Sequence, residues 1–355
     1  MKQEWLEGHK ARKRFGQNFL HDRHWIERIV RGIDPKPGDA LIEIGPGQAA
    51  LTREVIACAG HEAAVEIDRD LAQFLREQFS PEELTLIEAD ALKLDWTTVL
   101  EGRRLRIIGN LPYNISSPLL FALMSAADRV IDQHFMLQRE VVDRMVADPG
   151  SKTYGRLSVM LQYRYVMHKL FDVPPGAFVP PPKVTSSIVR MVPRPVESLP
   201  EVDMEIFSQV VALAFQQRRK TLRNALSTLM DDAAIKRAGV NPAARAETLD
   251  VAAFVRLARE AANLPHHSDP VWASLPYLLH FGQLLRRVEF GELYPPVRAE
   301  PLHLLPEDLR VIEMLEMRKL VRDHVGGDRI IKEDQPPGES DRIPRRTASP
   351  SHPRA

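Results

Sequence analysis

The motif Asn110-Leu111-Pro112-Tyr113 has the residue types that methyl transfer to the amino group of a nucleobase requires. An exocyclic amine such as N6 of adenine is a weak nucleophile, because its lone pair is delocalised into the ring. The side-chain oxygen of Asn110 and the backbone carbonyl of Leu111 are two acceptors that can bind the amino hydrogens and localise that lone pair. Tyr113 can stack on a base that has been rotated out of its helix. The motif therefore predicts a pocket for an adenine-like base, in which orientation of the reactants does most of the catalysis.

A second aromatic residue, Phe178, opens the proline-rich segment Phe178–Val184. Consecutive prolines make a stiff loop, and a stiff loop alone is the simpler interpretation of this segment. Its functional interpretation is a rigid mount that presents Phe178 to the face of the base opposite Tyr113. For Tyr113 by itself, the simpler interpretation is packing in the core.

A glycine-rich turn follows the first apolar run of the chain. Gly45, Gly47 and Ala50 fit the pattern G-x-G-x-x-A, which allows a tight turn and lets a ligand lie against the backbone. Glu66 follows about twenty residues later, where a carboxylate commonly binds ribose hydroxyls, and Asp90 stands after the next run. The pattern predicts a nucleoside site, for a dinucleotide or for S-adenosylmethionine. The alternative is that the glycines only form a turn and the carboxylates only cap helices.

Short apolar runs that alternate with helical stretches must position these motifs. Such alternation predicts an α/β fold with a parallel sheet that is covered by helices on both faces. The carboxyl ends of its strands would bring the glycine turn, Glu66, Asp90 and Asn110 to one edge. The runs are Ala40–Ile44, Ala63–Ile67, Leu84–Glu88, Leu105–Ile108, His134–Leu137, Tyr163–Leu170 and Ser186–Val192.

The second half of the chain changes character. Ile206–Met230 and Ala252–Ala262 have helical spacing, which predicts a small all-helical domain. We expect an N-terminal segment over residues 1–35, a main domain over 36–195, the helical domain over 200–264 and an extension of unassigned role over 265–355. The extension is expected to be disordered from about residue 332, where Pro, Ser, Gly and Arg accumulate.

Composition excludes several classes of protein. The chain has 355 residues, equal numbers of acidic and basic side chains and 44% hydrophobic residues, as expected of a globular protein. Its one cysteine, Cys58, excludes a disulfide framework and a cysteine-based zinc site, and we expect it in the core. No metal site is predicted, since His266 and His267 have no partner ligands nearby. No secretory signal and no membrane span is apparent, which predicts a cytoplasmic protein.

Basic residues cluster at two places despite the neutral total. One cluster is Arg12-Lys13-Arg14, and the other is Arg218-Arg219-Lys220 with Arg223. A solvated face is the simpler interpretation of each cluster. Contact with nucleic-acid phosphates is the functional one.

Taken together, these motifs make the chain resemble the bacterial small-subunit (16S) ribosomal RNA adenine N6,N6-dimethyltransferase family, whose loss is associated with kasugamycin resistance. The resemblance covers residues 1 to about 264. It is carried by Ala11–Asp22, Glu43–Leu51, Val65–Asp68, Asp90-Ala91, Gly109–Ser116, Gln138–Met145, Lys152–Met160, Phe178–Val184 and Gln217–Asn224.

The resemblance implies a Rossmann-like, class I S-adenosylmethionine-dependent methyltransferase fold with a seven-stranded, mostly parallel sheet. It implies S-adenosylmethionine as the cofactor, held by Asn18, Leu20, Gly45, Glu66, Asp90 and Asn110. The substrate would be two adjacent adenosines in the 3′-terminal hairpin of 16S rRNA, within the immature small subunit. Arg12–Arg14 would contact RNA, Phe15–Leu20 would fold over the donor as a lid, and the enzyme would act as a monomer.

Other functions remain open at this point. A large-subunit rRNA adenine methyltransferase of the macrolide-resistance type shares these motifs, and a DNA adenine methyltransferase could also use them. An NAD dehydrogenase would leave Asn110–Tyr113 unexplained. From a different class, the protein could act chiefly as an assembly factor that binds the small subunit.

Overall fold

A seven-stranded sheet forms the centre of the protein in the computed structural model, which describes residues 17–264. Its strand order is β4-β3-β2-β5-β6-β9-β7. Strands β2 to β6 pair in parallel, and β9 runs antiparallel to both β6 and β7. The strands are β2 Ala40–Ile44, β3 Glu62–Glu66, β4 Leu84–Glu88, β5 Leu105–Asn110, β6 Val130–Gln138, β7 Tyr165–Val173 and β9 Ser186–Pro193. The predicted mostly parallel sheet is thereby confirmed.

Five of the seven strands differ in their bounds from the sequence-based ranges, and two of these differences bear on the fold. The predicted run Ala63–Ile67 ends one residue too late, since β3 stops at Glu66 and Ile67 lies outside the strand. At the other edge of the sheet, Tyr163 and Arg164 belong to the end of a helix, and β7 begins at Tyr165. Aromatic residues with high strand propensity, Tyr163 and Tyr165, stand on both sides of this helix–strand junction, which is why the sequence did not separate the two.

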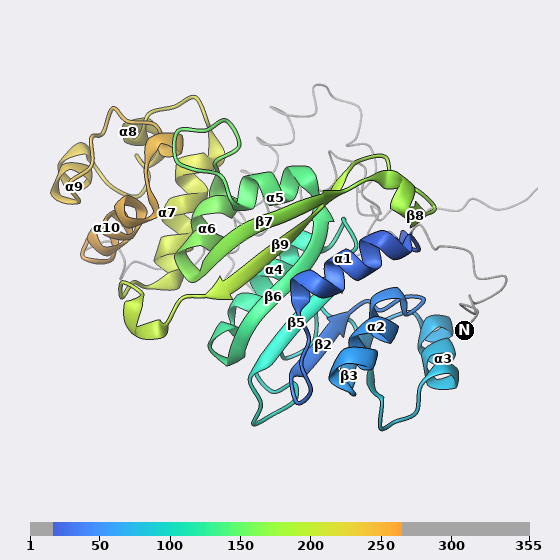
Figure 1. The fold of residues 1–355 in the computed structure, drawn as a ribbon. Helices are drawn as coiled ribbons and strands as arrows, with labels where there is room; N and C mark the ends of the chain where they lie inside the picture. Colours follow the sequence, from blue (N-terminus) through green and yellow to red (C-terminus); the bar gives the residue numbers. More distant parts are fainter. Residues whose placement is uncertain (1–16, 265–355) are drawn as a thin grey trace, which may run out of the picture. The chain divides into compact units, whose positions relative to one another are not determined.

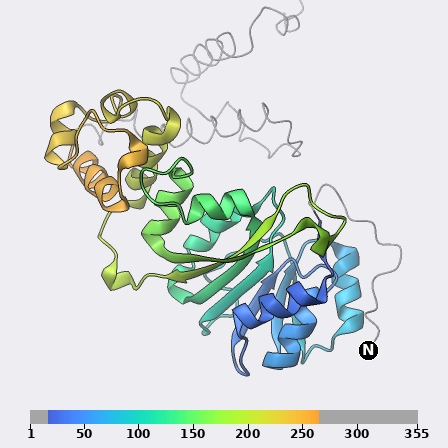
Figure 2. The same ribbon diagram turned by 45° about the horizontal axis from the view of Figure 1, so that its top comes forward.

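Helices cover both faces of the sheet (Figure 1, Figure 2). On one face α1 (Arg23–Ile33) and α2 (Ala50–Ala59) pack on Leu41 and Ile108, and α3 (Arg69–Gln78) packs on Ala64. On the other face α4 (Ser116–Met124), α5 (Arg139–Met145) and α6 (Arg156–Arg164) pack on residues such as Ile42 and Ile107. Adjacent residues of one strand thus pack against helices on opposite faces of the sheet, because side chains alternate between the two faces along a strand.

Cys58 is exposed on α2, so its expected place in the core is wrong. The buried face of α2 carries Leu51, Val55 and Ala59, at a spacing of four residues. Cys58 lies off that face because it precedes Ala59 by one position on the helix.

The last four helices share a separate hydrophobic cluster with α6, to which Phe207, Phe254 and Met160 belong. They are α7 Met204–Gln216, α8 Leu222–Ala225, α9 Asp232–Arg237 and α10 Val251–Ala262. The predicted continuous helix Ile206–Met230 is wrong, because α7 ends at Gln216 and a turn follows. Buried Leu222 and Leu226 continue the apolar spacing beyond that turn, and this continuation made two segments look like one. No helix within residues 17–264 is long and apolar enough to cross a membrane.

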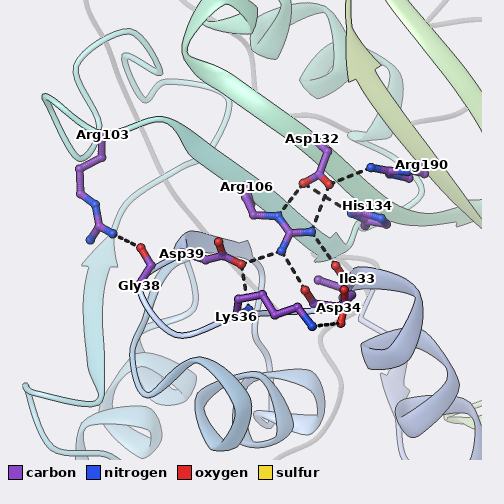
Figure 3. Close-up of polar contacts among 10 residues, drawn as sticks. All are labelled: Ile33, Asp34, Lys36, Gly38, Asp39, Arg103, Arg106, Asp132, His134 and Arg190. Atoms are coloured by element: carbon purple, nitrogen blue, oxygen red, sulfur yellow. Dashed lines mark hydrogen bonds and ion pairs between the residues drawn. The ribbon is translucent and has the colours of Figure 1, made fainter.

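Arg106 joins four segments at the amino ends of the parallel strands (Figure 3). From β5 its guanidinium donates to both carboxylate oxygens of Asp132 on β6, at 2.9 and 3.1 Å, and to Asp39 before β2 at 2.7 Å. It also donates to the carbonyls of Ile33 and Asp34, which end α1. Burial lowers the pKa of the nearby His134 to about 4, so this imidazole is neutral at neutral pH. Arg106 therefore carries the main positive charge inside the cluster.

Residues 1–16 and 265–355 lie outside the described part of the chain. The predictions for Arg12–Arg14, Phe15, His266, His267 and the C-terminal extension fall there. A short ladder close to the described N-terminus pairs β1 (Phe19–Leu20) with β8 (Phe178–Val179) in antiparallel fashion.

Candidate functional site

The candidate site lies where the order of the strands reverses direction along the sheet. The chain adds β3 and β4 on one side of β2, and β5 and β6 on its other side. The carboxyl ends of β2 and β5 therefore lie at the point of the sheet where open α/β folds commonly bind ligands. Gly45 follows β2 and Asn110 ends β5, so the two predicted motifs meet at this point.

Gly109 allows the ends of these two strands to approach closely. A Cβ atom at this position would lie 2.7 Å from the carbonyl oxygen of Ile44, at the end of β2. Glycine is thus required by the space available, and it places Asn110 directly beside the turn that follows β2.

The turn after β2 has a backbone that favours glycine. Gly45 and Gly47 have φ values of +69° and +56°, and the Gly45 amide donates to the carbonyl of Val65 at 2.9 Å. A Cβ atom on Gly47 would lie 3.1 Å from the ring of Phe19. Helix α2 begins directly after this turn, and its N-cap residue, Ala49, has no side-chain hydrogen bond to offer. The first backbone amides of α2 consequently receive no hydrogen bond from an N-cap side chain.

Glu66 lies where the sequence predicts a nucleoside-binding carboxylate. Its side chain accepts hydrogen bonds from the amides of Asp68 at 2.8 Å and Gly47 at 3.3 Å. The cap of α3 is Asp68, not Glu66, which removes the simple capping explanation for Glu66. The Ala89 amide donates to the Glu66 carbonyl at 3.1 Å, and the half-buried Asp90 follows it. The structure thus brings Gly47, Glu66 and Asp90 together.

Ile67 is a further candidate site residue, which the sequence did not single out. It stands between Glu66 and Asp68, outside β3, and its residue surface is 45% exposed. A large apolar side chain at this edge offers a flat ligand ring a contact surface. In the sequence, Ile67 is an apolar residue directly after Glu66. An apolar residue at this place looks the same as one more residue of the strand, and the predicted run therefore included it.

Asn110 has its amide orientation set by the N-terminal segment. Its Nδ2 group donates to the carbonyl oxygen of Asn18 at 3.0 Å, which leaves Oδ1 as the acceptor on the other side of the amide. The Leu111 amide donates to the carbonyl of Met136 on β6 at 3.2 Å, so the backbone of the motif is anchored to the sheet. The two predicted acceptors, Asn110 Oδ1 and the Leu111 carbonyl oxygen, are thereby held in defined directions.

The two aromatic residues of the predicted base pocket differ in their surroundings. Tyr113, the last residue of the motif, is half-buried, and burial raises the pKa of its phenol. Phe178 is only 2% exposed and packs with Leu20 and Ile188 in the core next to α1. Stacking of Phe178 on a base therefore requires another position of this side chain or of the β1–β8 ladder. Its role, like that of Tyr113, stays a prediction.

Residues 17–20 connect the two halves of the site. The Gln17 side chain donates to Asp68 at 3.2 Å, Asn18 accepts from Asn110, and the ring of Phe19 lies against Gly47. Leu20 is buried. Gln17 was not among the predicted site residues, since a single glutamine in a polar segment carries no signal of such a contact.

Three buried carboxyl groups lie on one face of the sheet below α2. Glu62 and Glu66 share a face of β3, and Glu43 lies on the same face of β2, paired in register with Ala64. Burial raises the pKa values of Glu43 and Glu66 to about 7, against the opposing hydrogen bond from the Thr52 hydroxyl to Glu43. Burial, reinforced by the charge of Glu43, raises the pKa of Glu62 well above its ordinary value. Within residues 17–264, neither oxygen of Glu62 has a hydrogen-bond partner.

Replacing Glu62 by leucine is expected to raise the free energy of unfolding by roughly 1–3 kcal/mol, the cost of a buried polar group without a partner. The gain should be larger at pH 8 than at pH 5. Folded Glu62 keeps its proton above pH 4.5, where the unfolded chain releases it, so the wild-type protein loses stability as the pH rises. Urea unfolding at both pH values measures this difference. The exposed Glu77→Leu on α3 is the control, and an equal gain at both pH values would contradict a protonated Glu62.

Of the second basic cluster, Arg218, Arg219 and Lys220 lie in the turn between α7 and α8, and Arg223 lies in α8. Arg218 forms an ion pair with Glu247 at 2.9 Å and also donates to the Lys152 carbonyl, and Arg223 donates to Asp232 at 2.9 Å. Arg219 and Lys220 are exposed, and neither forms an ion pair within the described residues. The structure therefore separates two residues with intramolecular partners from two that present their charge to solvent.

Metal binding finds no support in the part of the chain that the structure describes, where His, Cys, Asp and Glu side chains form no group of three or more suited to hold an ion. The site as built offers backbone amides, carboxylates and apolar surface on its β2–β3 side. On its β5 side it offers two oxygen acceptors beside an aromatic ring. This arrangement suits a nucleoside-containing cofactor next to a planar amine.

Comparison with known proteins agrees with this description. The family described as "Ribosomal RNA adenine dimethylase" matches residues 8–263. A protein of Aromatoleum aromaticum named "Ribosomal RNA small subunit methyltransferase A" is 57% identical over 249 residues, which cover 70% of this chain and 93% of that protein. Its namesake from Acinetobacter baylyi is 54% identical over 253 residues, or 71% and 92% of the two chains.

Two solved structures are similar to this fold. The crystal structure of the 23S rRNA methyltransferase ErmE aligns with a TM-score of 0.54 at 27% identity, covering 69% of this chain and all of that one. A dimethyladenosine transferase from Plasmodium falciparum aligns with a TM-score of 0.56 at 25% identity, covering 67% and 95%. The chain therefore belongs to the ribosomal RNA adenine dimethylase family, and its fold and enzyme class are those expected from the sequence, a methyltransferase that uses S-adenosylmethionine.

Proposed function

We propose that this protein transfers methyl groups from S-adenosylmethionine to N6 of two adjacent adenosines in the 3′-terminal hairpin of 16S rRNA, on the immature small subunit. The observation that carries the proposal is Asn110, whose acceptor oxygen is oriented by the Asn18 carbonyl beside the turn after β2. The name shared by the relatives from A. aromaticum and A. baylyi supports the small subunit as the source of the RNA.

The β2–β3 side of the site fits the methyl donor. The glycine turn lets a ligand approach the backbone, Glu66 and Asp90 can accept hydrogen bonds from ribose and amino groups, and Ile67 offers a surface to the adenine ring. When bound, S-adenosylmethionine supplies a methyl group on a positively charged sulfur that is a good leaving group. Residues 17–20 connect this side to Asn110 and would close over the donor.

The β5 side of the site fits the acceptor base. Asn110 Oδ1 and the Leu111 carbonyl would accept the two hydrogens of the adenine amino group, which turns its nitrogen lone pair toward the donor. As the nitrogen gains positive charge during transfer, the same two oxygens stabilise it electrostatically. Tyr113 would stack on the base, and Phe178 would contact the opposite face after the change of position described above.

RNA binding would use basic residues outside the pocket. Arg219 and Lys220 are the members of the second cluster that can contact phosphates without breaking an ion pair, whereas Arg218 and Arg223 would first have to leave Glu247 and Asp232. Arg12, Lys13 and Arg14 are proposed as further phosphate contacts. Such contacts give affinity and register, and the shape of the RNA would select the target. We propose a cytoplasmic monomer.

Replacing Glu66 by alanine is expected to lower the affinity for S-adenosylmethionine by roughly 10²- to 10³-fold, since two charge-assisted hydrogen bonds are lost. Methylation should disappear at ordinary donor concentration, while binding to small subunits should stay within twofold of wild type. Calorimetry with the donor and co-sedimentation with undermethylated subunits measure the two properties separately.

The same experiment distinguishes an enzyme from an assembly factor without enzymatic activity. Glu77→Ala, an exposed glutamate on α3, is the matched control and should change neither property. Unchanged methylation by Glu66→Ala would contradict the proposed donor site. Equal loss of methylation and subunit binding in a folded Glu66→Ala protein would contradict the separation of the two.

A further inference from the structure

The hydroxyl group of Tyr113 contacts a residue that no sequence motif singled out. Its oxygen lies 2.7 Å from Oγ of Ser186, a hydrogen bond between residues 73 positions apart in the chain. Ser186 is the first residue of β9, whereas Tyr113 follows β5. This bond therefore links the proposed base pocket to the antiparallel part of the sheet.

Ser186 has little freedom of position. It is fully buried, and its backbone pairs in register with Gln138 of β6 on one side and Val173 of β7 on the other. The next residue, Ser187, uses its hydroxyl for a different partner, Asp172, at 2.6 Å. The place of the Ser186 hydroxyl is thus set by two strand ladders, so that it forms a fixed anchor point.

Tyr113 is also fixed at its backbone end. The Ser116 hydroxyl donates to the Tyr113 carbonyl at 3.1 Å, and Ser116 is the buried first residue of α4. With its backbone held by α4 and its hydroxyl held by β9, the long axis of the tyrosine ring has a defined position. Stacking depends on that position, because two flat rings interact well only when they are suitably offset.

We propose that Ser186 is a positioning residue for methyl transfer, which holds the ring of Tyr113 at the position where the target adenine stacks. The inference rests on the proposed function and adds to it a residue that touches neither substrate. A tyrosine ring held in place keeps the bound base aligned with the donor, so the loss of Ser186 should lower kcat. The donor site on β2 and β3 should not respond to it.

A double-mutant cycle tests this inference. Ser186→Ala and Tyr113→Phe each remove one partner of the hydrogen bond and keep the aromatic ring. Each is expected to lower kcat roughly 3- to 10-fold, as the loss of one hydrogen bond implies. The double variant should be no slower than the slower single variant, because both substitutions remove the same bond. The affinity for S-adenosylmethionine, measured by calorimetry, should stay at the wild-type value in all three.

Ser187→Ala is the matched control, since it removes a buried hydroxyl from the adjacent position of β9 and should leave kcat unchanged. If Ser186→Ala has wild-type kcat, or if the losses of the two single variants multiply in the double variant, the inference is wrong. Equal losses in kcat and donor affinity would indicate a general structural effect and would also overturn it. If the wild-type protein transfers no methyl group to RNA, the proposed function fails, a result distinct from failure of the Ser186 inference alone.

Discussion

Replacing Asn110 by alanine is expected to lower kcat for methyl transfer by roughly 10²- to 10³-fold, the size of effect seen when one preorganised polar group aimed at developing charge is removed. The variant loses the Oδ1 acceptor for the adenine amino group. It also loses the Nδ2 bond that ties the N-terminal segment, through the Asn18 carbonyl, to the end of β5. Both losses affect the alignment of donor and acceptor, so kcat should fall further than the donor affinity.

Two further variants separate these contributions. Asn110→Asp keeps an acceptor oxygen but no donor for Asn18, and should retain more activity than Asn110→Ala. Asn263→Ala, at the exposed end of α10, is the matched control and should behave as wild type. Single-turnover rates at saturating donor measure the chemical step. If Asn110→Ala keeps more than about a tenth of the wild-type rate, the assigned role of its oxygen is wrong.

Replacing Arg106 by methionine is expected to cost roughly 3–5 kcal/mol of folding free energy. The substitution leaves the buried carboxylate of Asp132 without its bidentate partner and removes the donor to the carbonyls that end α1. The side chain of Arg106 is only 10% exposed, so that water compensates little for these losses. The double variant Arg106→Met/Asp132→Leu should recover most of the stability, because it leaves no unpaired charge on β6.

Urea unfolding measures the free energy of unfolding of each variant, so that the loss in Arg106→Met can be compared with the loss at an exposed ion pair. Arg76→Met removes an arginine from an exposed ion pair with Glu88 and is expected to cost less than about 1 kcal/mol. Arg106 stands at the amino end of β5 and Asn110 at its carboxyl end, so the folded fraction of Arg106→Met should bind S-adenosylmethionine with wild-type affinity. A cost of Arg106→Met as small as that of Arg76→Met would contradict the structural role of the buried cluster.

The strands and the edge on which the site lies could be predicted because both follow from local patterns. Buried parallel strands are continuous apolar runs, and Ala40–Ile44 has the predicted bounds, as does the half-buried edge strand Leu84–Glu88. Residues that follow such strands gather at one edge of a parallel sheet whatever the details of packing. The meeting of Gly47, Glu66 and Asn110 therefore required only strand order and chain direction.

Contacts between distant segments could not be predicted in the same way. The bond between Tyr113 and Ser186 depends on β9 returning antiparallel beside β6, and an isolated serine in an apolar strand gives no sign of it. The contact of Gln17 with Asp68 depends likewise on the path of the N-terminal segment. The turn that ends α7 was missed because apolar spacing continues across it, and the chain after the turn bonds to a later segment, since the Leu222 amide donates to the Ala244 carbonyl at 2.8 Å.

Methyl transfer from labelled S-adenosylmethionine, followed by nucleoside analysis, tests the central claim most directly. The acceptors are undermethylated small subunits, large-subunit rRNA and duplex DNA, each incubated with the full chain at the same concentration. The proposed function predicts label in N6,N6-dimethyladenosine with small subunits alone. Dimethyladenosine formed on large-subunit rRNA, or no transfer to small subunits by a protein that binds them, would contradict it.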